Sequence, residues 1–158
     1  MRALVVFYSR TGNTKRIAEE LSKMIDADTE ELHDTKNRKG IIGFILSGMD
    51  ARMMRKANLE KTRNNPAIYD MVILGTPTWS NRMSTPMRTY INQNCNSFKK
   101  VAFFLTSGFG NVKSAMAIFK DMASLCGKEP VATLSLGKKD INKKHLDKIE
   151  YFASTLVR

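Results

Sequence analysis

The feature that most constrains the fold of this chain is a short polar loop, residues 9–14 (SRTGNT), set between an apolar run and an amphipathic run. Residues 4–8 (LVVFY) are typical of a buried strand, and residues 14–25 carry apolar side chains at helical spacing. A loop between a parallel strand and the helix that follows it presents unpaired backbone N–H groups, with the positive end of the helix dipole behind them. Such a loop binds anions, and phosphate above all.

Three hydroxyl groups and one glycine make this loop suited to phosphate. Ser9, Thr11 and Thr14 offer hydroxyl donors, and Gly12 allows a close approach of the backbone to an oxygen atom or a positive φ. The spacing Ser-x-Thr-Gly-x-Thr directly after a first strand resembles the phosphate loop of the flavodoxin family, which holds the 5′-phosphate of FMN. In the alternative interpretation, Ser9 or Thr11 only caps the first helix.

Other phosphate-binding motifs do not occur in this loop. A nucleotide hydrolase would need Gly-x-x-x-x-Gly-Lys followed by Ser or Thr, and a dinucleotide fold would need Gly-x-Gly-x-x-Gly. A cysteine phosphatase would need its nucleophile here, whereas Cys95 and Cys126 lie elsewhere. The compact loop with no second glycine motif predicts FMN rather than FAD or a dinucleotide.

Two later loops are expected to meet the first one. Residues 71–74 (MVIL) predict a central strand that ends in residues 75–81 (GTPTWSN), and residues 101–105 (VAFFL) predict another that ends in residues 106–111 (TSGFGN). Ligands of open α/β sheets gather beyond the carboxyl ends of the strands. Both loops look like the loops that surround the flavin ring in the flavodoxin family. The resemblance implies that FMN is bound by Ser9, Arg10, Thr11, Gly12, Asn13, Thr14, Thr76, Pro77, Thr78, Trp79, Ser80, Asn81, Thr106, Ser107, Gly108, Phe109 and Gly110.

The resemblance gives Trp79 a particular role. Many flavodoxins place an aromatic residue of the second loop against the isoalloxazine, where it disfavours the electron-rich reduced ring. The alternative is a tryptophan in the core or on the loop surface. The third loop departs from the family pattern, because it lacks the tyrosine with which many electron-transfer flavodoxins cover the outer face of the ring. One face of the flavin is then left open to a substrate or a hydride donor.

Alternating strands and helices predict one α/β domain over residues 1–158, with a doubly wound, flavodoxin-like sheet of five parallel strands in the order 2-1-3-4-5. FMN is expected across the ends of strands one, three and four. Residues 34–39 and 137–140 are expected to be turns, and Ser84 or Thr85 is expected to cap a helix. The other two predicted strands cover residues 28–32, at the sheet edge, and 131–136. The other predicted helices cover residues 40–55, 112–126 and 141–156.

The segment from Gly40 to Arg55 is longer than a simple connection between two strands. It presents Ile41, Phe44 and Ile45 on a predicted helix, and Met49 and Met53 continue the same stripe. Three interpretations stay open: an ordinary helix that covers the sheet, a lid over the flavin, and a subunit contact in a homodimer.

The net charge of +11 bears on partners and location. It favours an acidic redox protein as partner, although a solvated lysine-rich surface explains it equally well. No apolar run is long enough to span a membrane, so no membrane partner is expected. Cys95 and Cys126 have no metal-ligand spacing, which predicts buried thiols in a reducing, cytoplasmic protein.

The leading functional hypothesis is an FMN-dependent electron carrier. The first rival is an NAD(P)H-dependent quinone reductase of flavodoxin-like fold, in which the small-molecule acceptor uses the open flavin face. The second is a non-redox binding module that uses its basic face; interleaved aromatic residues are missing, so nucleic acid is not expected. His33 and His145 have no companion ligand at metal spacing, and no metal site is expected.

Overall fold

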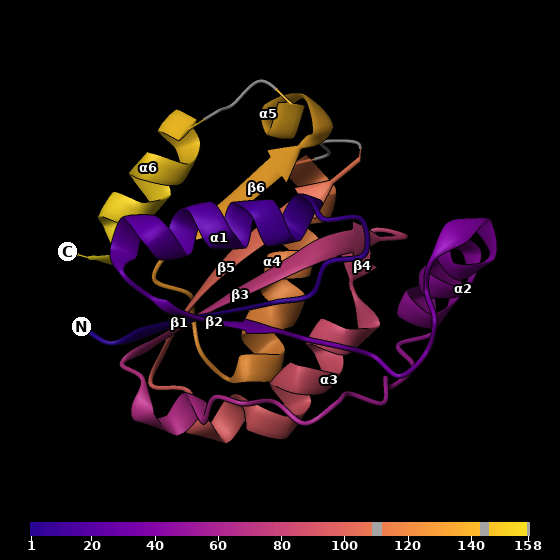
Figure 1. The fold of residues 1–158 in the computed structure, drawn as a ribbon, viewed down its shortest axis with the longest axis horizontal. Helices are drawn as coiled ribbons and strands as arrows, with labels where there is room; N and C mark the ends of the chain where they lie inside the picture. Colours follow the sequence, from indigo (N-terminus) through magenta and orange to yellow (C-terminus); the bar gives the residue numbers. More distant parts are fainter. Residues whose placement is uncertain (109–111, 143–145, 158) are drawn as a thin grey trace.

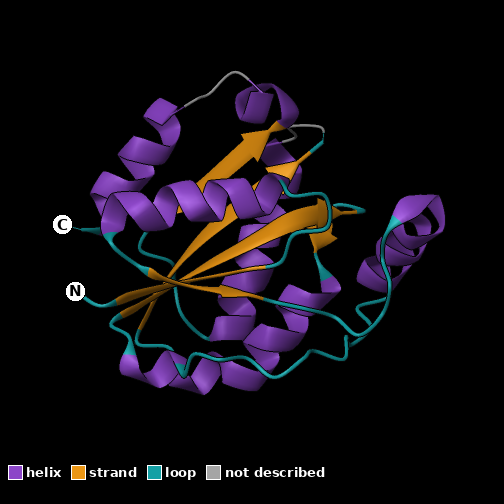
Figure 2. Ribbon diagram, viewed as in Figure 1, coloured by secondary structure: helices purple, strands orange, loops and turns teal. Residues whose placement is uncertain are grey.

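A computed structural model describes residues 1–108, 112–142 and 146–157, and its centre is a parallel sheet between two layers of helices (Figures 1 and 2). The sheet is built from β1 (Ala3–Phe7), β2 (Asp28–Glu31), β3 (Met71–Trp79), β5 (Lys100–Ser107) and β6 (Thr133–Gly137). These strands lie in the order β2-β1-β3-β5-β6, which is the predicted order 2-1-3-4-5 when they are counted along the chain. A short β4 (Arg82–Met83), which was not predicted, pairs antiparallel with the end of β3.

Helices cover both faces of the sheet, as the alternating sequence pattern predicts. α1 (Asn13–Ile25) and α6 (Leu146–Leu156) pack on one face, and α3 (Thr85–Asn94) and α4 (Val112–Cys126) pack on the other. α5 (Lys138–Asn142) follows β6, and two short 3₁₀ helices cover Pro66–Ile68 and Cys95–Ser97. Both ends of the described chain emerge on the opposite side of the molecule from α2 (Gly40–Arg52) (Figure 1). Among the described helices, none combines the length and apolar content needed to cross a lipid bilayer.

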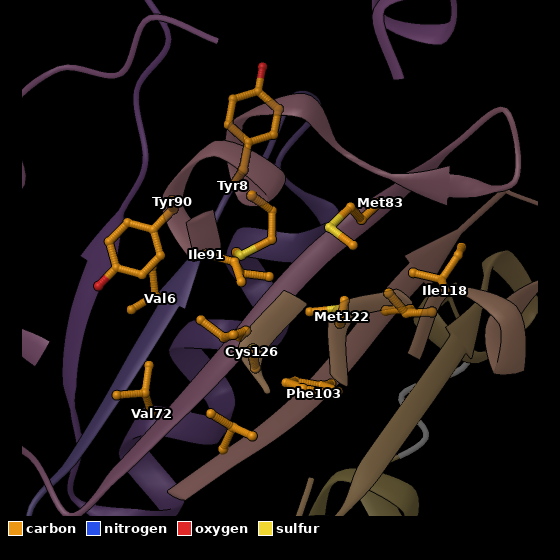
Figure 3. Packing of buried hydrophobic residues seen from close by; sticks show 14 of the residues in the cluster. Val6, Tyr8, Val72, Met83, Tyr90, Ile91, Phe103, Ile118, Met122 and Cys126 are labelled. Atoms are coloured by element: carbon orange, nitrogen blue, oxygen red, sulfur yellow. The ribbon is translucent and has the colours of Figure 1, made fainter. Parts of the chain in front are cut away.

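Strand alternation divides the core between the two faces. In β1, Leu4 and Val6 pack toward α3 and α4, while Val5 and Phe7 pack toward α1 and α6. Figure 3 shows the first of these clusters, in which strand residues meet side chains of α3 and α4. Tyr90 of α3 is fully buried in this cluster.

The second predicted loop is wrong in its first part, because β3 continues through Trp79. Parallel pairing with β5 extends to Pro77 opposite Thr106, so residues 75–77 belong to the sheet rather than to a loop. The turn is confined to Ser80 and Asn81, whose φ angles of 47° and 58° are left-handed, and β4 follows directly. Left-handed angles at both central residues match the twist of a two-residue hairpin.

The predicted turn at residues 137–140 is also wrong. Gly137 ends β6, and Lys138 begins α5. The carboxylate of Asp140 accepts a hydrogen bond of 2.9 Å from the Gly137 N–H, so a side chain within the first turn of α5 satisfies a donor just before it. Within the described residues, the helix predicted over 141–156 corresponds to the end of α5 and to α6.

Two burial predictions need correction. Cys126 is buried, and burial raises the pKa of its thiol to about 12. Cys95, the first residue of the 3₁₀ helix that follows α3, is only half-buried. The helix from Gly40 ends at Arg52 and does not cover the sheet, because it lies beyond the carboxyl ends of β1 and β3 (Figure 1). Most of its large apolar side chains are exposed. The interpretation as an ordinary covering helix is therefore wrong.

Candidate functional site

The carboxyl edge of the sheet brings the three predicted loops together. The backbone N–H of Tyr8 donates to the carbonyl of Gly75 at 3.2 Å, which places the first loop beside β3. The hydroxyls of Thr14 and Thr106 lie 2.8 Å apart in a buried hydrogen bond, which ties the start of α1 to the end of β5. Residues far apart in sequence thus form one site, as the strand order predicts.

The first loop is arranged to receive an anion. Gly12 is the residue before α1 and has φ of 92°, a left-handed angle that favours glycine. Its N–H donates to the hydroxyl of Ser9 at 3.1 Å. No side chain of the described residues caps α1, so the interpretation of Ser9 or Thr11 as a helix cap is wrong. The first N–H groups of α1 remain available, with the positive end of its dipole behind them.

A hollow of about 190 Å³ lies among the three loops. Most of the predicted cofactor residues line it, from all three loops. These are Arg10, Thr11, Asn13, Thr14, Pro77, Thr78, Trp79, Thr106, Ser107 and Gly108. No acidic side chain is among the described lining residues, and Arg10 adds a positive charge, so the hollow suits an anionic group.

The remaining predicted residues do not line this hollow. Thr76 is fully buried, and its hydroxyl donates to the hydroxyl of Ser84 at 2.9 Å. This hydrogen bond connects β3 to the start of α3. Ser80 lies in a neighbouring hollow, and the side-chain oxygen of Asn81 accepts a 3.0 Å hydrogen bond from Ser114. Ser9 and Gly12 shape the backbone of the first loop. Phe109 and Gly110 fall outside the described residues.

Trp79 occupies the wall between two hollows. The second hollow, of about 240 Å³, lies between α2 and the β3–β4 turn and shares Phe44, Thr78 and Trp79 with the first. Only 6% of Trp79 is exposed; its ring meets Tyr8 edge-on at 5.3 Å, and the Arg38 guanidinium lies 5.3 Å from its centre. Contact between Trp79 and the flavin stays a prediction.

Sequence reasoning missed three contributors to the site. Phe44 of α2 and Ile141 of α5 line the hollow with the loops, and Arg38 contacts Trp79. The sequence pointed to Phe44 only through the interpretation of residues 40–55 as a lid. In the structure, the guanidinium of Arg10 lies 5.0 Å from the centre of the Phe44 ring. For Ile141 and Arg38 the sequence carries no comparable signal, because their places depend on long-range packing.

Tyr8 contacts Trp79 and lies near the guanidinium of Arg38. Burial raises the pKa of its phenol above the ordinary value, although the nearby Arg38 guanidinium opposes this effect. Tyr8 therefore remains a neutral side chain that packs against Trp79 at neutral pH. No group of three or more potential metal ligands occurs in the described parts of the chain, so the site offers no metal centre there.

The sequence matches the profile of the family described as Flavodoxin over residues 2–148. The chain belongs to the flavodoxin family. This assignment agrees with the sequence resemblance carried by the first loop, and it covers nearly the whole chain. A search of curated proteins found no significant match to this sequence.

Solved structures share the fold of this flavodoxin-family chain at low sequence identity. A flavoprotein from Lactobacillus acidophilus NCFM, solved in complex with FMN, is 23% identical, with a TM-score of 0.71 over 90% of this chain and 97% of that one. Oxidised flavodoxin 2 from Bacillus cereus is 20% identical, with a TM-score of 0.63 over 99% and 98%. The Trp repressor binding protein from Bacillus subtilis is 16% identical, with a TM-score of 0.65 over the full length of both chains.

Proposed function

We propose that this flavodoxin-family protein binds FMN at the carboxyl edge of its sheet and carries electrons between redox partners. The observation that carries the proposal is the single hollow lined by all three loops, with Thr14 and Thr106 joined at 2.8 Å behind it. The FMN complex of the Lactobacillus neighbour supports the choice of cofactor. FMN supplies the electron chemistry, and the protein binds and orients it.

Each loop has a separate task in this proposal. Arg10, the Thr11 hydroxyl and the first N–H groups of α1 hold the phosphate at the positive end of the helix. Pro77, Thr78 and Trp79 flank one side of the ring, and the residues at the end of β5 bind its far edge. Backbone N–H groups at that edge would provide fixed hydrogen-bond donors to the ring.

The partner and location are part of the same proposal. An acidic redox protein, or a small anionic electron acceptor, would be attracted by the net charge of +11. Both cysteines are free thiols, which is consistent with a cytoplasmic protein.

A reductase is the second candidate, because a second hollow adjoins the flavin site. Phe44, Ile45, Met49 and Trp79 give it apolar walls, and it shares its boundary with the first hollow. Stopped-flow mixing of the FMN-loaded protein with NADPH separates the candidates. A carrier leaves the flavin absorbance unchanged over seconds, whereas rapid bleaching by NADPH alone would establish the reductase.

Replacement of Thr11 by alanine tests the phosphate site directly. The variant loses one hydrogen bond to a dianionic group, worth about 1.5 kcal/mol, and its FMN dissociation constant is expected to rise about tenfold. Riboflavin lacks the phosphate, so its affinity is expected to stay the same. Flavin fluorescence quenching measures both constants on the apoprotein.

The matched control is Thr133→Ala. This threonine is exposed and begins β6, at the end of the strand away from the carboxyl edge of the sheet. This control variant is expected to bind both flavins as the wild type does. Equal losses of FMN and riboflavin affinity in Thr11→Ala would show that the phosphate lies elsewhere. Failure of the wild-type apoprotein to take up FMN would refute the function itself.

A further inference from the structure

The outward face of α2 is apolar and uncovered. The α2 face consists of Ile41, Ile42, Phe44, Ile45, Met49 and, just past the helix, Met53, and these residues are between 49% and 81% exposed. The buried residues of the same helix are Gly43, Ser47, Asp50 and Ala51. The helix thus buries its small and polar side and exposes its large apolar side, the reverse of a surface helix.

Buried ion pairs fix this orientation. The Asp50 carboxylate accepts hydrogen bonds from Lys36 at 2.8 Å and from Arg38 at 2.9 Å, and Arg38 also donates to Asp34 at 2.6 Å. The side chains of Arg38, Asp34 and Asp50 are only 2–3% exposed. A rotation of α2 that buried its apolar face would pull Asp50 away and leave Arg38 without one of its partners, at a high desolvation cost.

Two glycines of α2 also fix the orientation of the helix. A Cβ atom on Gly43 would lie 2.2 Å from the carbonyl carbon of Arg38, and one on Gly48 would lie 2.9 Å from the hydroxyl oxygen of Ser80. The backbone of α2 therefore lies too close to its neighbours to admit isoleucine or phenylalanine on these positions. The large apolar side chains of the α2 face therefore lie on the other sides of the helix, where they are at least 49% exposed. Phe44, Ile45 and Met49 among them also border the hollow beside Trp79.

Basic residues lie at both ends of this face. Lys39 precedes α2, Arg52 lies in its last turn, and Arg55 and Lys56 follow; all four are exposed. From residue 39 to residue 56 the only acidic residue is Asp50, which is buried. A second copy of the chain would bring the same basic ends together, and this repulsion argues against a homodimer through α2.

We propose that α2 docks the protein onto an anionic lipid surface. The α2 face would enter the boundary between headgroups and acyl chains, while the basic residues at its two ends contact anionic headgroups. The helix lies at the margin of the molecule (Figure 1), and a lipid surface accepts a marginal helix without a shape-matched groove. Interfacial docking needs no membrane-spanning segment, so it goes beyond the sequence prediction of no membrane partner. Phe44 also lines the flavin hollow, so docking brings that site to the lipid surface.

Co-sedimentation with lipid vesicles tests the proposal. The wild type is expected to bind vesicles of equal parts phosphatidylglycerol and phosphatidylcholine at least tenfold more tightly than vesicles of phosphatidylcholine alone. Combined replacement of Ile41, Ile42 and Ile45 by serine is expected to weaken binding at least tenfold. The matched control is Tyr151→Ser on α6, which removes a side chain of an equally exposed residue (76%) and is expected to bind as the wild type does.

A charge variant and the apoprotein complete the test. Lys39→Gln combined with Arg52→Gln is expected to weaken binding to the phosphatidylglycerol vesicles at low salt and to have little effect at high salt. Circular dichroism confirms the fold of each variant. Because the α2 face does not depend on FMN, the protein should bind vesicles with and without the cofactor, so loss of FMN binding and loss of lipid binding are distinguishable.

Three outcomes would overturn the proposal. Wild-type protein that ignores both kinds of vesicle would leave an acidic protein with an apolar groove as the occupant of α2. Equal binding by the serine variant would place the lipid contact elsewhere. A wild-type dimer in sedimentation velocity, converted to a monomer by the three serines, would assign the face to a second copy.

Discussion

Arg38 connects the proposed flavin site to α2 through a single side chain. Its guanidinium lies 5.3 Å from the centre of the Trp79 ring and donates to Asp34 and Asp50. The sequence placed this residue in a polar turn and gave it no role, because neither partner is marked by any local pattern. The hydroxyls of the first loop could be predicted for the opposite reason: Ser9, Thr11 and Thr14 lie in one continuous stretch with a characteristic spacing.

Replacement of Asp50 by asparagine removes the central carboxylate of this network. Arg38 then keeps only one carboxylate partner, Asp34. A buried guanidinium that has lost one of its two carboxylates is costly, so the free energy of unfolding is expected to fall by about 2–4 kcal/mol. Urea denaturation at neutral pH measures the change. Asp26→Asn, at an exposed left-handed position where asparagine is well accepted, serves as the control and should leave stability within about 0.5 kcal/mol of the wild type.

The difference in stability between the wild type and Asp50→Asn is expected to depend on pH. Burial alone would raise the pKa of Asp50, but hydrogen bonds from Lys36 and Arg38 outweigh it and hold the pKa below its ordinary value. Because the pKa of Asp50 is lower in the folded state than in the unfolded state, its ionised carboxylate stabilises the protein at pH values above the unfolded pKa of about 4. This contribution is lost as the pH falls through the folded-state pKa. The stability difference between the wild type and Asp50→Asn is thus expected to shrink in acid. A difference that grew below about pH 4 would contradict the assignment.

At the scale of single elements, β3 and α2 show where sequence patterns stop being informative. The run Gly-Thr-Pro-Thr has the composition of a loop, yet pairing with β5 holds Gly75, Thr76 and Pro77 in the sheet. Proline is tolerated there because it lies close to the end of the strand. For α2, the spacing of apolar residues located the helix correctly but not the side that it buries. Burial of Ser47 and Asp50 depends on the ion pairs beneath them, which no periodicity indicates.

Gly75 makes β3 sensitive to the smallest substitution. A Cβ atom at this position would lie 2.0 Å from the Cζ atom of Phe104, which is itself fully buried. Gly75→Ala is therefore expected to lower the free energy of unfolding by about 1–3 kcal/mol through overpacking. Thermal unfolding followed by circular dichroism measures the loss.

A second substitution separates this steric effect from the backbone change. Phe104→Leu provides room for the added methyl group, so the double variant is expected to lose less than the sum of the two single variants. Additive losses would show that Phe104 is not the obstacle, and full stability of Gly75→Ala alone would show that the strand accommodates a side chain.

For the whole molecule, the order of the five long strands followed from the alternation of strands and helices, because right-handed crossovers leave few alternatives. The net charge of +11 was equally plain in the sequence, but its distribution was not. Only the fold shows that the single acidic residue between residues 39 and 56 is buried, so that the exposed charges around α2 are all positive. Charge placement depends on which side of a helix is buried, and that is a property of the whole fold.

The two chain ends emerge on the side of the molecule opposite α2 (Figure 1). A tag, a fusion protein or a linker to an electrode, attached at either end, would therefore extend away from the carboxyl edge of the sheet. Immobilisation through such a linker would present the proposed flavin loops to the solution, so direct voltammetry of the FMN-loaded protein would need no redesign of its surface.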